Sequence, residues 1–221
     1  MKQIQEIKRE DAESDLTFAG FVVISCPLKK DSKVVIKELI NSSHHVAMIT
    51  GDNPLTACHV AKELKFSKDK PILILTKQGN LKDGLNGVIP QGEDNLWQWQ
   101  SVNGKTCFPV MNNELSKHEF ENALKKLVGE YAICITGEGL NFLQRFRPKL
   151  HARIIPHVKI FARFAPKQKE HVITGLRDKG FTVLMCGDGT NDVGALKHAH
   201  CGVAILSNAP KLQGNQELTF L

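Results

Sequence analysis

The sequence lacks several features that would assign it to whole classes of protein. No stretch approaches the roughly 20 consecutive apolar residues that a bilayer span needs, and the charged start, residues 1–13, is unlike a signal peptide. The six cysteines include no Cys-x-x-Cys pair, so we expect neither a zinc site nor a disulfide framework. We therefore expect the chain taken alone to be soluble and to belong in a reducing compartment.

The sequence also lacks a basic stripe interleaved with aromatic residues. Its net charge of +6 is moderate, and the lysines and arginines are dispersed along the chain. This pattern argues against nucleic-acid binding. The hydrophobic share of 42% fits an ordinary folded core, and 221 residues suffice for one large domain or one domain with an insertion.

The chain does contain short apolar runs that alternate with helical patterns. This alternation predicts an α/β fold with a parallel sheet and right-handed crossovers. Strands are expected at residues 18–26, 45–49, 72–75, 131–135, 158–162, 181–185 and 203–206. Helices are expected at residues 31–40, 54–64, 114–128, 140–146, 167–179 and 192–199. Residues 77–109 are expected to form an elaborated loop or small insertion in which Trp97 and Trp99 pack locally.

The most informative segment is a Gly-rich turn, Cys186 to Asp192, at the carboxyl end of an expected strand. Open α/β sheets bind ligands at that end of their strands. Asp188 and Asp192 supply the hard oxygen atoms that suit Mg²⁺, which usually takes one or two carboxylates besides water and phosphate. The alternative is a solvated turn that ends in an Asp or Asn helix cap.

Two further strand ends carry groups that suit a phosphate. Thr50-Gly51-Asp52 ends one strand and opens a helix, where free N–H groups and the helix dipole attract anions. A capped helix start is the alternative there, and both can hold together. In the segment from Ala162 to Lys169, Lys169 lies in the first turn of a helix, where a cation is unfavourable unless an anion is near. Lys167 is expected to be an ordinary solvated lysine.

A hydroxyl, a cation and a carboxylate pair at three strand ends favour phosphoryl transfer. These ordered segments resemble the phosphorylation-domain motifs of P-type ATPases, which belong to the haloacid-dehalogenase-like (HAD-like) superfamily. Cys26-Pro27-Leu28-Lys29 resembles the type V, subclass A members of the endoplasmic reticulum, described as translocases that remove misinserted transmembrane helices.

The resemblance implies a doubly wound parallel sheet that is incomplete at its N-terminal side. Residues 1–16 would be an arm or the end of the nucleotide-binding domain. Residues 17–206 would be a partial phosphorylation domain with an insertion at about 77–130. Residues 207–221 would form a C-terminal tail.

The resemblance also implies roles for the phosphate-binding residues. Thr50 and Gly51 would hold the phosphoryl oxygens, with Asp52 in the same catalytic loop. Lys169 would neutralise the aspartyl phosphate.

For the cofactors, Mg²⁺ and ATP, the implied residues lie on three loops. Asp188 would ligate Mg²⁺, and Asn191 and Asp192 would order the catalytic site. Arg163, with Asn53, would reach towards the nucleotide at a domain hinge.

The family's phosphorylated motif, Asp-Lys-Thr-Gly-Thr, is not in this sequence, and no Asp stands in an Asp-x-Thr or Asp-x-Asp setting at a first strand end. We therefore interpret the chain as a fragment or truncated isoform that is inactive alone. Its full protein would bind ATP and a transported substrate and would sit in the endoplasmic reticulum membrane, with this region on the cytosolic face. The alternatives are a soluble HAD-like phosphatase, against which the missing nucleophile argues, and a non-catalytic regulatory isoform.

Overall fold

The computed structural model describes residues 8–23, 27–77 and 96–205, and the chain divides into two units, Met1–Lys30 and Asp31–Leu221. The first unit holds α1 (Arg9–Ala12). The strand expected at residues 18–26 is wrong over residues 18–23, which form no strand, and Phe21 and Val22 are each 89% exposed. Residues 24–26, including Cys26, lie outside the described residues. An apolar run forms a strand only where another strand accepts its hydrogen bonds.

The second unit is built on a six-stranded sheet in the order β1-β6-β5-β2-β3-β4. Its strands are β1 (Met48–Ile49), β2 (Ile72–Lys77), β3 (Trp97–Ser101), β4 (Cys107–Pro109), β5 (Ala132–Thr136) and β6 (Val158–Ala162). β1, β6, β5 and β2 run parallel, and β3 and β4 extend the sheet in antiparallel pairs. The expectation of a mostly parallel α/β sheet is confirmed.

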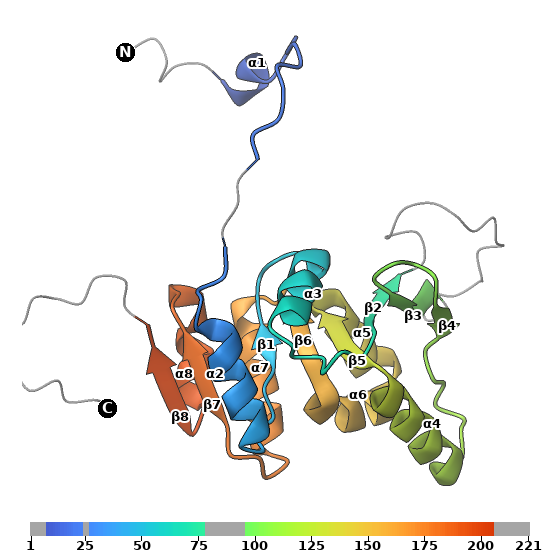
Figure 1. Cartoon of the computed structure of the whole chain (residues 1–221). Helices are drawn as coiled ribbons and strands as arrows, with labels where there is room; N and C mark the ends of the chain where they lie inside the picture. Colours follow the sequence, from blue (N-terminus) through green and yellow to red (C-terminus); the bar gives the residue numbers. More distant parts are fainter. Residues whose placement is uncertain (1–7, 24–26, 78–95, 206–221) are drawn as a thin grey trace, which may run out of the picture. The chain divides into compact units, whose positions relative to one another are not determined.

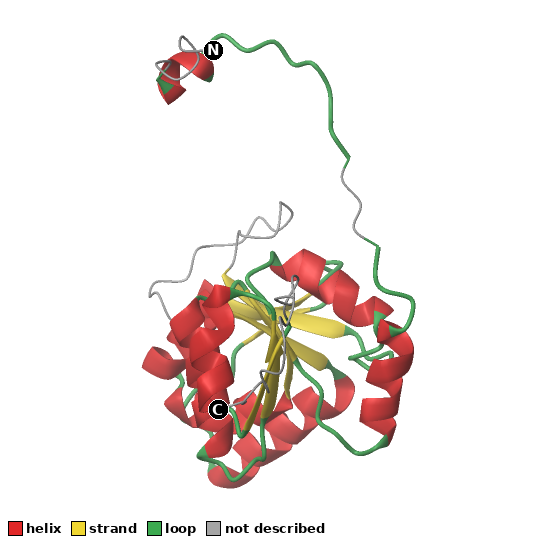
Figure 2. Ribbon diagram, turned by 90° about the vertical axis from the view of Figure 1, so that its left-hand side faces the viewer, coloured by secondary structure: helices red, strands yellow, loops and turns green. Residues whose placement is uncertain are grey.

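Helices cover both faces of this sheet, as Figure 2 shows. One face packs on α4 (Lys117–Glu130), α5 (Gly137–Phe146), α6 (Pro148–Ile154) and α7 (Pro166–Arg177). The other packs on α2 (Ser32–Asn41) and α3 (Pro54–Glu63). Neighbouring residues of β2 join opposite cores, since Leu73 faces the first set of helices and Ile74 the second. Such double coverage explains why the parallel strands are continuous apolar runs.

A second, two-stranded parallel sheet joins β7 (Leu184–Gly187) to β8 (Cys201–Ala204). α8 (Val193–His198) connects them and packs on α7, as Figure 1 shows. Short 3₁₀ turns lie at Ile155–His157 (η3) and Thr190–Asp192 (η4). Ile49 of β1 packs against both the main core and the small core under β7, so the two sheets share a common packing boundary.

The outer face of the two-stranded sheet is apolar and exposed. Leu184 is 63% exposed, Val203 41% and Ile205 53%. Cys186 is exposed as well. Parallel strands usually have both faces covered, so this part of the fold presents a surface typical of a core.

The sequence did not predict the strands β3 and β4. Trp97 and Trp99 lie on alternate residues of β3 and are 7% and 1% exposed. Both belong to the main core, so the expectation that they pack only within a local loop is wrong. In the part of the chain described here, no helix combines the length and apolarity needed to span a bilayer.

The cysteines of the main core behave as packing residues. Cys134 and Cys58 are buried side by side between β5 and α3. A hydrogen bond with the Cys58 thiol and burial hold the pKa of Cys134 well above its usual value. The side chain is therefore a neutral thiol that packs as a small hydrophobic residue.

Candidate functional site

The loop after β1 is ordered by its own polar side chains. The Thr50 N–H donates to the carbonyl of Phe161 at 2.8 Å. The Thr50 hydroxyl donates to Asp52 Oδ2 at 2.9 Å, and the Asp52 N–H donates to that hydroxyl at 3.1 Å. Asn53 caps α3, its Oδ1 accepting from the Leu55 N–H at 2.9 Å. The capping interpretation of this segment is confirmed, and it leaves Gly51 exposed at the tip.

The loop after β6 is bonded directly to the loop after β1. The Arg163 N–H donates to the Asp52 carbonyl, and the Phe164 N–H to the Thr50 carbonyl, both at 3.0 Å. Arg163 has a φ of +56°, a left-handed conformation that is uncommon outside glycine and often marks functional sites. These hydrogen bonds join the two loops, residues 50–53 and 163–164, into one surface at the carboxyl ends of β1 and β6, which we call the ledge.

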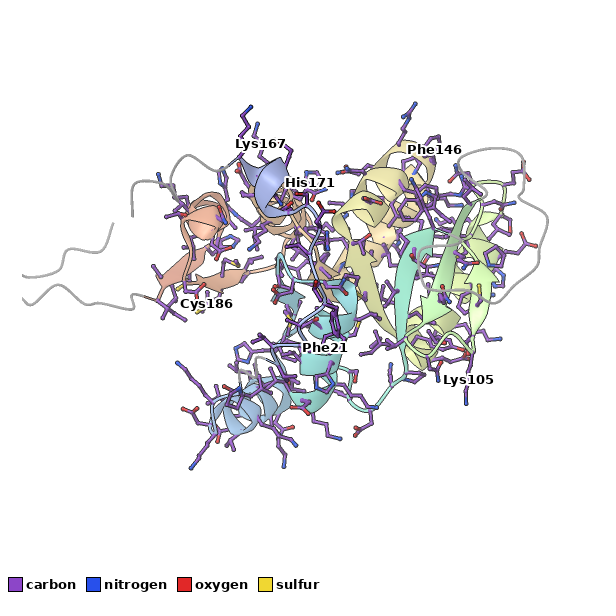
Figure 3. All side chains as sticks on the ribbon, turned by 90° about the horizontal axis from the view of Figure 1, so that it is seen from above. Phe21, Lys105, Phe146, Lys167, His171 and Cys186 are labelled. Atoms are coloured by element: carbon purple, nitrogen blue, oxygen red, sulfur yellow. The ribbon has the colours of Figure 1, made fainter. Side chains whose placement is uncertain are left out.

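Lys169 and Asp192 form a buried ion pair. Lys169 Nζ lies 2.7 Å from Asp192 Oδ1, and each side chain is only 10% exposed. Asp192 fits because residue 187 is glycine, where a Cβ would lie 2.7 Å from Asp192 Oδ2. Lys167, two residues before Lys169, points away from the body of the unit in Figure 3. The sequence therefore separated the buried lysine from the solvated one correctly.

Asp188 and Asn191 lie exposed on the turn between β7 and α8. No hydrogen bond or ion pair joins the Asp188 carboxylate to another described residue. Across residues 8–23, 27–77 and 96–205, no cluster of three or more His, Cys, Asp or Glu could hold a metal. One free carboxylate fits Mg²⁺, which fills its other positions with water and phosphate oxygens.

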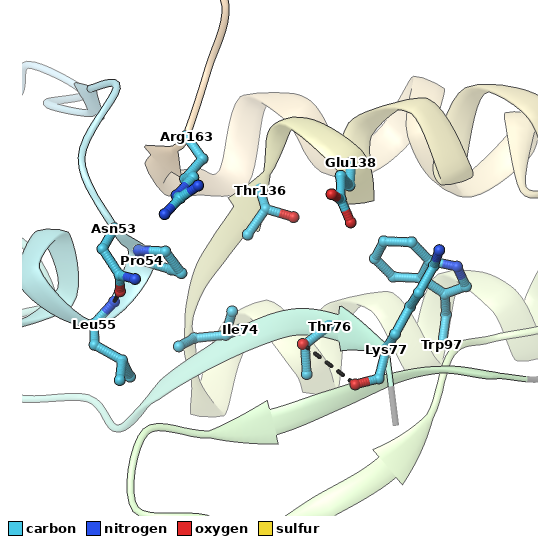
Figure 4. Close-up of a pocket in the computed structure, with 10 residues that line it drawn as sticks. All are labelled: Asn53, Pro54, Leu55, Ile74, Thr76, Lys77, Trp97, Thr136, Glu138 and Arg163. Atoms are coloured by element: carbon cyan, nitrogen blue, oxygen red, sulfur yellow. Dashed lines mark hydrogen bonds between the residues drawn. The ribbon is translucent and has the colours of Figure 1, made fainter. Parts of the chain in front are cut away.

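A cavity of about 430 Å³ lies beside the ledge, at the carboxyl ends of four strands. Figure 4 shows the Arg163 guanidinium at one end, between Asn53 and Thr136, and Lys77 beside Trp97 at the other. The Lys77 ammonium lies 5.5 Å from the centre of the Trp97 ring. The residues that line the cavity are Asn53, Pro54, Leu55, Ile74, Thr76, Lys77, Trp97, Thr136, Glu138 and Arg163.

The end of β5 contributes groups that sequence reasoning missed. Ile135-Thr136-Gly137-Glu138 repeats the pattern Ile49-Thr50-Gly51-Asp52, and both segments link a parallel strand to a helix. The Thr136 hydroxyl caps α5 by accepting from the Gly139 N–H at 3.1 Å. Comparing the two Ile-Thr-Gly-acid segments would have found this strand end from the sequence.

Gly137 gives a testable consequence of the tight contact between α5 and the loop after β6. A Cβ there would lie 2.6 Å from the Arg163 carbonyl oxygen and 2.5 Å from Gln168 Oε1. Gly137→Ala is therefore expected to lower the free energy of unfolding by about 1–3 kcal/mol, because the backbone must move. Urea denaturation of this chain measures the change. Gly175→Ala, in α7 with no atom within 4 Å of its Cβ position, is the matched control and should be neutral or stabilising; equal losses for both variants would refute the contact.

The predicted residues fall into two groups. Thr50, Gly51, Asp52 and Asn53 share the ledge with Arg163. The second group is Lys169, Asp188, Asn191 and Asp192. The start of α7 connects the two groups. The loop that begins at Arg163 leads into the first turn of this helix, and Lys169 lies in that turn. His198 and His200, two histidines near the end of α8, belong to neither group, and both imidazoles form hydrogen bonds with backbone atoms.

Comparison with known proteins gives several relatives of nearly the whole chain. The chain is 42% identical over 208 residues, 94% of its length, to a probable manganese-transporting ATPase, PDR2, of Arabidopsis thaliana. It is 41% identical over 208 residues, 93% of its length, to an endoplasmic reticulum transmembrane helix translocase of Saccharomyces cerevisiae. It is 30% identical over 207 residues to the probable cation-transporting ATPase 13A5 of Homo sapiens.

These matches cover only part of each relative. The chain spans 16% of the Arabidopsis protein, 15% of the yeast protein and 16% of the human protein. No protein-family model matches the chain. By its identity to these proteins, the chain belongs to the family of P-type ATPases that includes endoplasmic reticulum transmembrane helix translocases and cation-transporting ATPases, and it matches a segment of about one sixth of their length.

Proposed function

We propose that this chain is part of the phosphorylation domain of a longer type V P-type ATPase, which couples ATP hydrolysis to transport through an aspartyl phosphate. The phosphorylated aspartate is supplied by a segment outside this sequence. The partial coverage of the relatives supports this proposal, since most of each relative lies outside the matched region.

The observation that carries the proposal is the pair of strand edges between the two sheets. β1 is hydrogen-bonded to β6 and β7 to β8, and neither has a second strand partner among the described residues. The order β6, α7, β7 is that of a β-α-β crossover, a connection that joins parallel strands. Unpaired backbone groups at strand edges favour the addition of a strand. One further parallel strand between β1 and β7 would join the sheets into one.

The carboxyl end of that strand would emerge between the loops after β1 and β7. An aspartyl phosphate there would meet the Thr50 hydroxyl and the Gly51 N–H on one side. Lys169 would neutralise its charge, because an ammonium has three donors and keeps two after bonding to Asp192. Phosphoryl transfer needs this kind of positioning and charge neutralisation more than covalent chemistry by the protein.

Asp188 would hold Mg²⁺ at the same place, with Asn191 and the Lys169–Asp192 pair ordering the turn. When bound, Mg²⁺ supplies positive charge that offsets the phosphate and the incoming ATP. Arg163 and Asn53 would contact the nucleotide from the ledge. The site residues come from loops that the fold places at strand ends, which supports their assignment.

For the whole protein, we propose ATP-driven removal of transmembrane helices at the endoplasmic reticulum membrane. The relatives from Saccharomyces cerevisiae and Schizosaccharomyces pombe are endoplasmic reticulum transmembrane helix translocases, at 41% and 40% identity. This segment would act on the cytosolic side, and the regions that select the transported substrate would lie elsewhere in the protein.

Phosphorylation by radiolabelled ATP tests the proposal. This chain alone is expected to form no acid-stable phosphoenzyme in Mg²⁺ and to hydrolyse no ATP above background, because it has no aspartate in the required setting. The intact ATPase that carries this segment should form a phosphoenzyme. ATP turnover or phosphoenzyme formation by the isolated chain would contradict the proposal and favour a soluble phosphatase.

A further inference from the structure

The side chain of Gln168 joins three parts of the unit. Its Oε1 accepts from the Ala165 N–H at 3.1 Å, within the loop after β6. Its Nε2 donates to the Gly137 carbonyl at 2.9 Å and to Asn141 Oδ1 at 3.1 Å, both in α5. The amide orientation is fixed by this network, since a flipped amide would face a donor with a donor and an acceptor with an acceptor.

The contact fixes the start of α7 against the start of α5. Gln168 immediately precedes Lys169, and the N–H groups of both donate to the Ala165 carbonyl, at 2.9 and 3.1 Å. Gly137 adds to the fit, because its missing Cβ lets the Arg163 carbonyl come close. The turn that bears Arg163 and Lys169 is thereby held to α5 by side-chain and steric contacts.

We propose that Gln168 is a positioning residue that sets Lys169 for charge neutralisation at the phosphate. The proposal rests on the proposed function of Lys169. Gln168 itself touches neither Lys169 Nζ nor a reacting group; it acts through the first turn of α7. A misplacement of about 1 Å from a change outside the reacting groups can cost about a hundredfold in rate, so loss of this contact affects catalysis more than stability.

The variants Gln168→Ala and Gln168→Glu separate the parts of the contact. Alanine removes every hydrogen bond of the side chain. Glutamate keeps an acceptor for the Ala165 N–H but, when ionised, has no donor for the Gly137 carbonyl. Gln144→Ala is the matched control, because Gln144 also bridges α5 and α7, through His171 at 2.7 Å, but lies away from the loop after β6.

The measurement is the rate of phosphoenzyme formation in the intact ATPase that carries this segment, with Lys169→Ala measured alongside. Both Gln168 variants should be slower by roughly tenfold or more, the range found for groups that orient a site without entering it, at unchanged apparent affinity for ATP. Gln144→Ala should match the unmodified protein. Urea denaturation of this chain should show similar losses of stability for Gln168→Ala and Gln144→Ala.

The pH profile gives a readout that a purely structural role would not move. Between pH 7.5 and 5, the Gln168→Glu variant should recover relative to Gln168→Ala, because its carboxyl gains a proton to donate as the pH approaches the ordinary glutamate pKa of about 4.3.

The outcomes are distinguishable. Normal phosphorylation in Lys169→Ala would refute the proposed role of Lys169. Loss in Lys169→Ala together with rates in the Gln168 variants equal to Gln144→Ala would refute the positioning role alone. The positioning role would also be refuted if the rates of phosphoenzyme formation of Gln168→Glu and Gln168→Ala were equally reduced at every pH.

Discussion

Asp188→Ala is expected to lower the rate of Mg²⁺-dependent phosphoenzyme formation by about a hundredfold or more in the intact ATPase that carries this segment. The Asp188 side chain is exposed on the turn after β7 and has no hydrogen bond or ion pair with the residues described here. Its removal should therefore leave the fold intact while removing the hard oxygen ligand for Mg²⁺. The rate of phosphoenzyme formation across a Mg²⁺ titration measures the effect.

Asp178→Ala is the control for Asp188→Ala. Asp178 is an exposed carboxylate at the C-terminal end of α7, the opposite end of that helix from Lys169. The Asp178→Ala variant should leave the rate of phosphoenzyme formation and its Mg²⁺ dependence unchanged. A normal Mg²⁺ titration for Asp188→Ala would exclude Asp188 as the metal ligand.

Lys169→Ala is expected to impair both stability and phosphorylation. The side chain of Asp192 is only 10% exposed, so losing Lys169 leaves a buried carboxylate without its partner. Breaking a buried pair in this way costs about 3–5 kcal/mol of unfolding free energy. Urea denaturation of this chain measures that loss, and Lys167→Ala, two residues away and exposed, should show almost none.

The double variant Lys169→Met, Asp192→Asn separates the two effects. It removes both charges, so it should be closer in stability to the unmodified chain than Lys169→Ala is. In the intact ATPase it should still fail to form phosphoenzyme, because no cation remains to neutralise the phosphate. Phosphorylation at the normal rate in the double variant would contradict the role of Lys169.

Local pattern predicted the parallel strands and their loops well. The apolar runs that become β2, β5 and β6 are buried on both faces, and their composition alone signals this. Lys167 and Lys169 both lie in the first turn of α7, so the helix dipole alone does not separate them; the resemblance to the phosphorylation-domain motif assigned Lys169 to the phosphate. The loops after β1, β6 and β7 followed from the rule that ligands bind at carboxyl ends of strands.

The failures concern contacts between distant parts of the chain. Residues 18–23 have the composition of a strand, yet without a partner they stay exposed. The sequence analysis missed β3. Residues Trp97–Ser101 alternate apolar and polar side chains, as a strand does, but they follow a segment with the composition of a loop. The contact of Gln168 with Gly137 joins residues 31 apart, and no local pattern indicates it.

Hydrogen–deuterium exchange at the two strand edges tests the central claim most directly. If a strand from another segment of the ATPase lies between β1 and β7, amides of Met48–Ile49 and of Leu184–Gly187 should exchange more slowly in the intact ATPase than in this chain alone. β4 (Cys107–Pro109), at the far edge of the large sheet, should exchange alike in both. Unchanged exchange at β1 and β7, with the intact protein forming phosphoenzyme, would contradict the account.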